Sequence, residues 1–109
     1  MPLPEISVTE AKARLASTAP PRLIDVREQD EWDLCHLPGA ELIPLSRFGE
    51  LAAERFTDPA EPLLIYCHHG GRSAQVTAYL LRNGFTDVTN VAGGIDAWSL
   101  HVDPSKPRY

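Results

Sequence analysis

The stretch LLIYCHHGGRSAQ, residues 63–75, decides the fold that this sequence predicts. Leu63 to Tyr66 form a nearly continuous apolar run, which is typical of a strand that is covered on both faces. From Ser73 onward, apolar residues recur at helical spacing until Gly84, a natural helix terminator. Between the two segments lies a short polar loop that begins with Cys67. The pattern therefore predicts a strand–loop–helix unit with Cys67 at the carboxyl end of the strand.

The rest of the chain repeats this alternation of short apolar runs and longer amphipathic segments. Further strands are predicted at residues 5–8, 22–26, 41–43 and 87–91, and helices at 10–16, 29–34, 46–56, 73–83 and 93–98. Strands that alternate with helices predict an α/β fold with a largely parallel sheet, and right-handed crossovers place helices on both faces. Ligands of such sheets gather at the carboxyl ends of the strands, where Cys67 lies.

Local signals refine the ends of these segments. A threonine or serine side chain can accept a hydrogen bond from the free amides of a first helical turn, so we expect Thr9 and Ser73 to cap helices. Residues 37–40, with the sequence LPGA, predict a turn. The tail from Asp103 contains two prolines, and we expect it to fray.

Composition limits the classes of function. The chain has 109 residues, the size of one domain, and a formal net charge of -5, which disfavours a general role on nucleic acid or on anionic membranes. No apolar run approaches the roughly 20 residues that span a bilayer, and the first residues do not have the pattern of a secretory signal. With only two cysteines, Cys35 and Cys67, we expect free or catalytic thiols in a reducing compartment, with the cytoplasm as the default.

The loop after the strand has the composition of an anion cradle. A cysteine reacts as its thiolate, and Gly70 and Gly71 let the backbone turn tightly with its amides pointing inward. The positive end of the following helix also favours an anion. The remaining loop residues are polar or cationic: His68, His69, Arg72 and Ser73. The alternative is a buried, inert cysteine beside a simple glycine turn, which has no need of these polar neighbours.

At this point the chain resembles the rhodanese, or sulfurtransferase, family. The resemblance covers about Ile6 to Trp98 and rests on four motifs in combination, each weak by itself: DVRE at residues 25–28, HLPGA at 36–40, the Cys67 loop, and GGIDAW at 93–98. It implies a single rhodanese-like domain over residues 1–109, with a core at about 6–98, a tail at 103–109, and a five-stranded parallel sheet between helices. It also implies that Cys67 is the catalytic residue and carries sulfur as a persulfide.

Loop length separates branches of this fold. Related phosphatases and arsenate reductases have five residues between cysteine and arginine, whereas only four separate Cys67 from Arg72. A shorter ring of amides, from about His68 to Ser73, suits a single sulfur better than a phosphate. We therefore expect transfer of sulfur from a small donor such as thiosulfate to cyanide, a thiol or a partner protein, without a metal or organic cofactor. The alternatives are a sulfur carrier or docking module with little turnover and, disfavoured by the loop, a phosphatase or arsenate reductase.

Other residues have more than one interpretation. Asp25 and Arg27 end a neighbouring strand and are expected to support the site. Arg72 can bind the substrate anion or pair with a carboxylate such as Asp25 or Glu28, while His68 and His69 can attract the donor or face solvent.

Cys35 is a departure, because the family usually has glycine at this position. It can resolve a persulfide, form a disulfide with Cys67, or pack as a bystander, which we favour. A zinc site from Cys35, His36 and the Cys67 loop lacks paired ligand spacing and is disfavoured.

Overall fold

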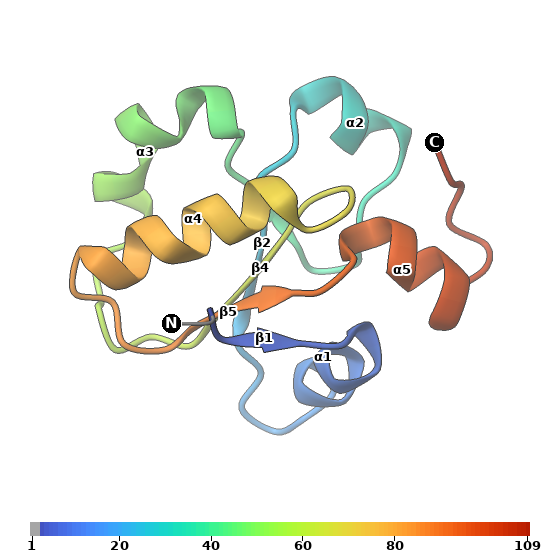
Figure 1. Cartoon of the computed structure of the whole chain (residues 1–109), viewed down its shortest axis with the longest axis horizontal. Helices are drawn as coiled ribbons and strands as arrows, with labels where there is room; N and C mark the ends of the chain where they lie inside the picture. The colour runs from blue at the N-terminus through green and yellow to red at the C-terminus, as the bar shows by residue number, and fades with distance from the viewer. Residues whose placement is uncertain (1–2) are drawn as a thin grey trace.

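A computed structural model describes residues 3–109 and contains one sheet of five parallel strands (Figure 1). The strands are β1 (Glu5–Ile6), β2 (Arg22–Asp25), β3 (Glu41–Leu42), β4 (Leu63–Tyr66) and β5 (Val88–Val91). Their order across the sheet is β1-β5-β4-β2-β3, and every neighbouring pair is parallel. All carboxyl ends therefore lie at one edge, and the predicted α/β fold with a five-stranded parallel sheet is confirmed.

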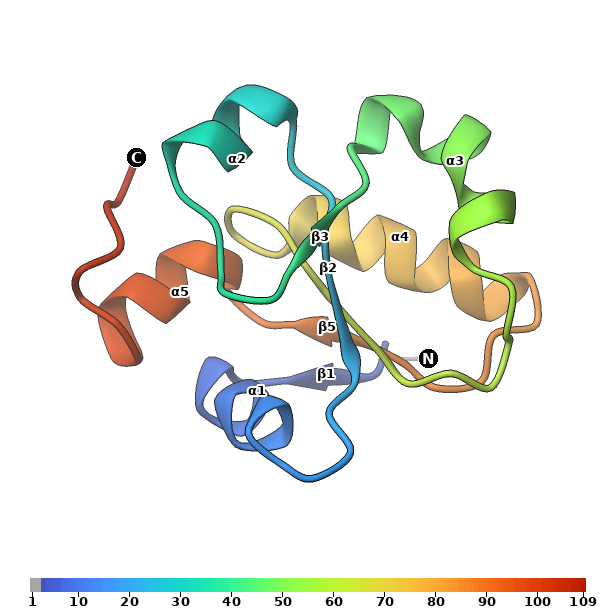
Figure 2. The same cartoon turned by 180° about the vertical axis from the view of Figure 1, so that it is seen from behind.

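Helices cover both faces of this sheet, as the two opposite views show (Figures 1 and 2). They are α1 (Val8–Leu15), α2 (Gln29–Leu34), α3 (Phe48–Arg55) after a short 3-10 turn (Leu45–Arg47), α4 (Gly71–Arg82) and α5 (Gly94–His101). Helices α3 and α4 lie over one face, while α1 and α5 lie over the other. Helix α2 has no buried residue and stands beside the edge formed by the carboxyl ends of the strands. No helix within residues 3–109 is long and apolar enough to cross a membrane.

Two hydrophobic cores follow from this layering. On the α3/α4 face, Phe48, Val76 and Leu80 pack against strand residues such as Ile24 and Ile65. On the opposite face, Val8, Ala11, Ile95 and Trp98 pack against Leu23, Leu64 and Tyr66. Alternate residues of β4 thus enter opposite cores, and all four of its residues are buried. This is the physical reason for the continuous apolar run that the sequence shows there.

The strand register brings chemically important positions together. Asp25 of β2 pairs with Tyr66 of β4, so these two strands end level with each other just before Cys67. On the other side of β4, Asn90 of β5 pairs with Ile65, which precedes Cys67 by two residues. The loop after β4 passes between α2 and α5 at this edge (Figure 1). Residues at the ends of β2, β4 and β5 therefore lie close to the Cys67 loop.

Both predicted caps were wrong. The cap of α1 is Ser7 rather than Thr9, since the Ser7 hydroxyl accepts from the Glu10 amide at 3.2 Å. Helix α4 begins at Gly71 after Gly70, so the predicted cap Ser73 lies inside its first turn. In both cases the helix begins earlier than expected, because the preceding strand or loop is shorter than its pattern suggested.

Candidate active site

Cys67 lies where β4 ends and has an exposed fraction of 1%. Its Sγ accepts from the backbone N–H of Gly70 at 3.1 Å and of Ser73 at 3.4 Å, and the Ser73 hydroxyl oxygen is also 3.4 Å away. Helix α4 has twelve residues, and the Ser73 amide belongs to its first turn. Backbone amides at a helix N-terminus carry partial positive charge, so this geometry favours an anionic sulfur.

A left-handed backbone at Gly70 makes this loop possible. Gly70 has φ +106°, a backbone conformation that residues with a side chain rarely adopt, and its N–H donates to Cys67 Sγ. An added Cβ would also come within 3.3 Å of the Gly93 nitrogen. The glycine therefore provides both the turn and the close packing against the segment that starts α5.

Gly94 belongs to the GGIDAW motif, but the sequence did not indicate its contact with the Cys67 loop. The first turn of α5 packs directly onto the Cys67 loop, because the Ile95 N–H donates to the Cys67 carbonyl at 2.9 Å and the Asp96 N–H donates to the His68 carbonyl at 3.0 Å. With φ +56°, Gly94 has no room for a side chain, since its Cβ would overlap the Cys67 carbonyl oxygen. The GGIDAW motif holds this helix end against the loop.

Arg72 forms an ion pair with a carboxylate of α2. Its guanidinium forms two hydrogen bonds with Glu31, at 2.6 and 2.9 Å. These bonds hold the pKa of Glu31 well below its usual range, at about 2, with a further contribution from the Tyr109 hydroxyl. The pairing interpretation of Arg72 is therefore correct in kind, but the partner is Glu31 of α2 rather than Asp25 or Glu28.

Asp25 and Arg27 form a buried pair beside the loop. Both side chains have an exposed fraction of 0%, and Arg27 contacts the Asp25 carboxylate through Nε and through Nη2, the latter at 2.7 Å. Arg27 Nη2 also donates to the Cys35 carbonyl at 2.6 Å. The hydrogen bonds to Asp25 raise the pKa of Arg27 despite its burial. These contacts tie the end of β2 to the chain after α2.

The tail does not fray as expected. The Tyr109 ring stacks on His68 with centroids 3.8 Å apart, and its hydroxyl contacts both Arg27 and Glu31 at 2.7 Å. Arg108 forms two hydrogen bonds with Asp96 of α5. The segment expected to be free instead packs beside the Cys67 loop (Figure 1), because its aromatic and cationic side chains find partners that are distant in sequence.

The two histidines of the loop have different surroundings. The His68 ring is held between Tyr109 and His69, and its Nε2 is buried without a hydrogen-bond partner among residues 3–109. Burial lowers the pKa of His68 and so disfavours its charged form. His69 is exposed and lies 3.7 Å from Asp96. The positive charge that the sequence suggested at this loop is therefore not supplied by His68.

His68, His69 and Asp96 place possible metal-ligand atoms within 4.8 Å of one another. The two imidazoles stack at 3.9 Å with planes only 18° apart, so their in-plane lone pairs lie in nearly parallel planes. Asp96 is already paired with Arg108. The cluster does not contain Cys35, which the disfavoured zinc site required.

Cys35 and Cys67 belong to different parts of the molecule. Cys67 packs into the core under α3 and α4, whereas Cys35 borders the core under α1 and α5. The Cys35 backbone has φ -169° and ψ 155°, an extended conformation that any residue adopts. Its Sγ lies 3.9 Å from the Pro107 carbonyl oxygen. The packing is that of the bystander predicted for this cysteine, and the position does not require the usual glycine.

Asn90 is a buried polar residue that sequence reasoning missed. Asn90 has an exposed fraction of 1%, and its side chain contacts Ser73 and Gly70 beneath the loop. The available signal was an amide in the middle of a short strand, VTNV, in which every residue is buried. An amide in such a position needs hydrogen-bond partners, and the Cys67 loop supplies them.

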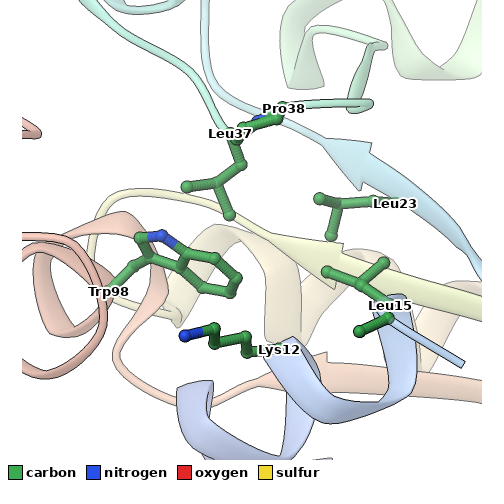
Figure 3. A pocket seen from close by; sticks show the side chains of 7 residues that line it. Lys12, Leu15, Leu23, Leu37, Pro38 and Trp98 are labelled. Carbon is green, nitrogen blue, oxygen red and sulfur yellow. The ribbon is translucent and has the colours of Figure 1, made fainter.

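A cavity of about 230 Å³ lies away from this site (Figure 3). Its lining includes Leu15, Leu23, Leu37 and Trp98, with Lys12 at one side. Three of these side chains, from Leu23, Leu37 and Trp98, belong to the core under α1 and α5, whereas Cys67 belongs to the core on the other face of the sheet. The cavity is therefore separate from the sulfur of Cys67.

The family model for the rhodanese-like domain matches residues 7–101, and the chain belongs to this family. It is 39% identical over 113 residues to the rhodanese-like/PpiC domain-containing protein 12, chloroplastic, of Arabidopsis thaliana, covering 99% of this chain and 38% of that protein. It is 32% identical over 79 residues to the thiosulfate sulfurtransferase GlpE of Coxiella burnetii, covering 72% of each. The human single-domain sulfurtransferase TSTD1 has a similar structure, with a TM-score of 0.79 and 28% sequence identity. The match covers 92% of this chain and 98% of TSTD1.

The relatives differ greatly in length. The chain spans 38% of the Arabidopsis protein and only 22% of the probable adenylyltransferase/sulfurtransferase MoeZ of Mycobacterium tuberculosis, to which it is 40% identical over 89 residues. The shared part is therefore the rhodanese-like domain. Those longer proteins also contain regions that this chain does not match.

The close approach at Gly94 predicts a large stability loss on Gly94→Ala. The new Cβ would overlap the Cys67 carbonyl oxygen in a backbone conformation that disfavours side chains, so we expect a loss of about 3 kcal/mol or more in urea unfolding. Gly49→Ala in α3 is the matched control, since its Cβ meets nothing within 4 Å, and we expect no loss. Equal stabilities of the two variants would contradict the packing of α5 on the loop.

The Arg72–Glu31 pair predicts an acid-sensitive contribution to stability. Because the folded pKa of Glu31 lies below its ordinary value of 4.5, the contribution is full above about pH 4.5 and is lost as the pH falls toward 2. Wild type should therefore lose about 1–2 kcal/mol more than Glu31→Gln between pH 7 and pH 3 in urea unfolding.

Glu50→Gln is the control for this comparison. Glu50 pairs with Arg47 on the surface, where both side chains are more than half exposed, so this variant should keep the pH dependence of wild type. A pH dependence of Glu31→Gln equal to that of wild type would show that the pair does not titrate as described.

Proposed function

We propose that this domain is a sulfurtransferase that moves a sulfane sulfur through a persulfide on Cys67. The observation that carries the proposal is the geometry around Sγ, where the amides of Gly70 and Ser73 converge at 3.1 and 3.4 Å at the start of α4. These donors favour the thiolate, which is the reactive form of cysteine. Membership of the rhodanese-like family and the names of the relatives GlpE and TSTD1 support the same chemistry.

In the first step, the Cys67 thiolate attacks the outer sulfur of thiosulfate or a similar donor. A sulfur–sulfur bond forms on Cys67, the bond between the two donor sulfurs breaks, and sulfite leaves with that electron pair. The products are a Cys67 persulfide anion and a sulfite dianion, so charge is conserved. Amides of residues 68–73 then hold the terminal sulfur, as fixed donors hold other anionic intermediates.

In the second step, a nucleophilic acceptor removes the outer sulfur. Cyanide attacks this atom, thiocyanate forms, and Cys67 leaves as a thiolate that is ready for the next cycle. A thiol or a sulfur-accepting protein takes the place of cyanide in the cell. The scheme is covalent and two-step, and it uses Cys67 as the reacting group and the surrounding amides as its electrostatic support.

The charged residues around the loop have supporting roles in this scheme. Arg72 is engaged by Glu31 and therefore orients the loop more than it binds a free anion. His68 and His69 follow Cys67 in the loop with their rings stacked on each other, and the Asp25–Arg27 pair supports the end of β2. Donor binding thus depends mainly on backbone groups of the loop, including those of Gly70, Gly71 and Ser73.

A sulfur carrier with little turnover is the second candidate. The same cradle can hold a persulfide until a partner protein takes the sulfur, and the 1% exposed fraction of Cys67 favours a protected sulfur. A phosphatase or arsenate reductase is disfavoured by the four-residue spacing from Cys67 to Arg72 and by the engagement of Arg72 with Glu31.

The test is intact-mass analysis after exposure to thiosulfate. We expect one added sulfur atom on wild type and on Cys35→Ser, removal of this sulfur by a thiol, and none on Cys67→Ser, whose thiocyanate production should fall more than about 10³-fold. Fast loading with slow turnover would identify the carrier. Persulfide on folded Cys67→Ser, or hydrolysis of an aryl phosphate without sulfur loading, would overturn the proposed function.

A further inference from the structure

The Ser73 hydroxyl faces three acceptors but has one proton. Its Oγ lies 2.5 Å from Asn90 Oδ1, 3.2 Å from the Gly70 carbonyl oxygen and 3.4 Å from Cys67 Sγ. All four residues are buried. A hydroxyl donates only one hydrogen bond at a time, so the acceptor that takes this proton decides what Ser73 offers to Cys67.

The surroundings of Asn90 determine which way its amide points. Asn90 Nδ2 lies 3.1 Å from the Glu5 carboxylate and 3.4 Å from the Gly70 carbonyl oxygen. Both of these groups are acceptors, so the NH₂ end of the amide must face them. Oδ1 consequently faces Ser73, and because an amide oxygen only accepts, the Ser73 hydroxyl must donate to it.

We propose that Asn90 is a positioning residue that sets the balance between thiol and thiolate at Cys67 by holding the proton of the Ser73 hydroxyl. With this proton committed to Asn90, Ser73 Oγ presents only lone pairs to Cys67 Sγ. It can accept a hydrogen bond from the neutral thiol, but it donates none to the thiolate. Hydrogen bonds to one protonation state favour that state, so Ser73 favours the thiol while the Gly70 and Ser73 amides favour the thiolate.

This inference rests on the proposed function only in taking Cys67 as the reactive thiol. Its consequence is that Cys67 is less anionic in the resting protein than its amide cradle alone would make it. The group that holds the Ser73 proton belongs to β5, and its orientation depends on the Glu5 carboxylate of β1. Neither strand contacts Cys67 Sγ in the hydrogen-bond network.

The charged groups of the neighbouring elements are not themselves substituted when Asn90 or Ser73 is changed. They are Arg72 of α4 with Glu31 of α2, His68 and His69 of the loop with Asp96 of α5, Arg108 of the tail, the Asp25–Arg27 pair of β2, and Glu5 of β1. A shift that depends on the Ser73 hydroxyl can therefore be separated from these charges by changing Asn90 with and without Ser73.

The test follows the rate of Cys67 alkylation by iodoacetamide against pH, in a Cys35→Ser background that leaves one thiol. Asn90→Leu keeps the number and branching of the side-chain heavy atoms of Asn90 but accepts no hydrogen bond, so the freed Ser73 hydroxyl can turn to the thiolate. We expect the midpoint of the profile to fall by about one pH unit, which is about tenfold more thiolate below both midpoints. Asn90→Ala should shift the midpoint in the same direction.

Ser73→Ala, alone and combined with Asn90→Leu, completes a double-mutant cycle. The single variant also tests the proposal without changing Asn90. Because the hydroxyl favours the thiol in the wild type, Ser73→Ala should lower the midpoint, and Asn90→Leu should add no further shift in this background. A higher midpoint in Ser73→Ala would show that the hydroxyl already donates to the thiolate and would overturn the proposal. So would an unchanged or higher midpoint in Asn90→Leu, or an equal shift with and without Ser73.

Thiosulfate loading of the same proteins separates this inference from the proposed function. If the cycle behaves as expected but Cys67 takes up no sulfur, the positioning role of Asn90 stands and the sulfurtransferase proposal fails. If sulfur loads normally and the cycle shows no dependence on Ser73, only the role of Asn90 fails.

Discussion

The conformation of the Cys67–Gly70 turn depends on hydrogen bonds made on both of its sides. Inward, the Gly70 amide points at Cys67 Sγ; outward, the carbonyls of Cys67 and His68 accept from the first turn of α5. A backbone that turns its amides inward leaves its carbonyls facing out, and buried carbonyls need partners. The absence of a side chain at Gly94 lets α5 come close enough to provide them. Two motifs that are distant in sequence thus form one cradle.

Charges near the cradle are largely neutralised in pairs. Arg72 is paired with Glu31, Arg27 with Asp25, and Arg108 with Asp96. Burial lowers the pKa of His68, which disfavours a positive charge on this ring. What remains directed at Cys67 Sγ is a set of backbone dipoles from Gly70 and Ser73, and these dipoles need no rearrangement when charge develops on sulfur. This arrangement supports the proposed transfer of a small anionic sulfur group.

The sequence predicted the elements better than it predicted their contacts. The strand Leu63–Tyr66 and the helix Gln29–Leu34 have the predicted bounds, because burial on both faces and an acidic helix start are local signals. The partner of Arg72, the packing of Tyr109 and the network of Asn90 were not predicted, because each joins residues that are 17 or more positions apart. Nothing in the residues near Arg72 distinguishes Glu31 from Glu28.

The sequence by itself determined the parallel α/β architecture, the position of Cys67 after a buried strand, and the spacing of four residues before Arg72. These properties depend on hydrophobic periodicity and on residue order, both of which are local. Only the tertiary structure decided which amides face the sulfur, that α5 closes on the loop, and that Asn90 holds the Ser73 hydroxyl. Directed contacts of this kind depend on strand register and helix placement, which are set by the packing of the whole domain.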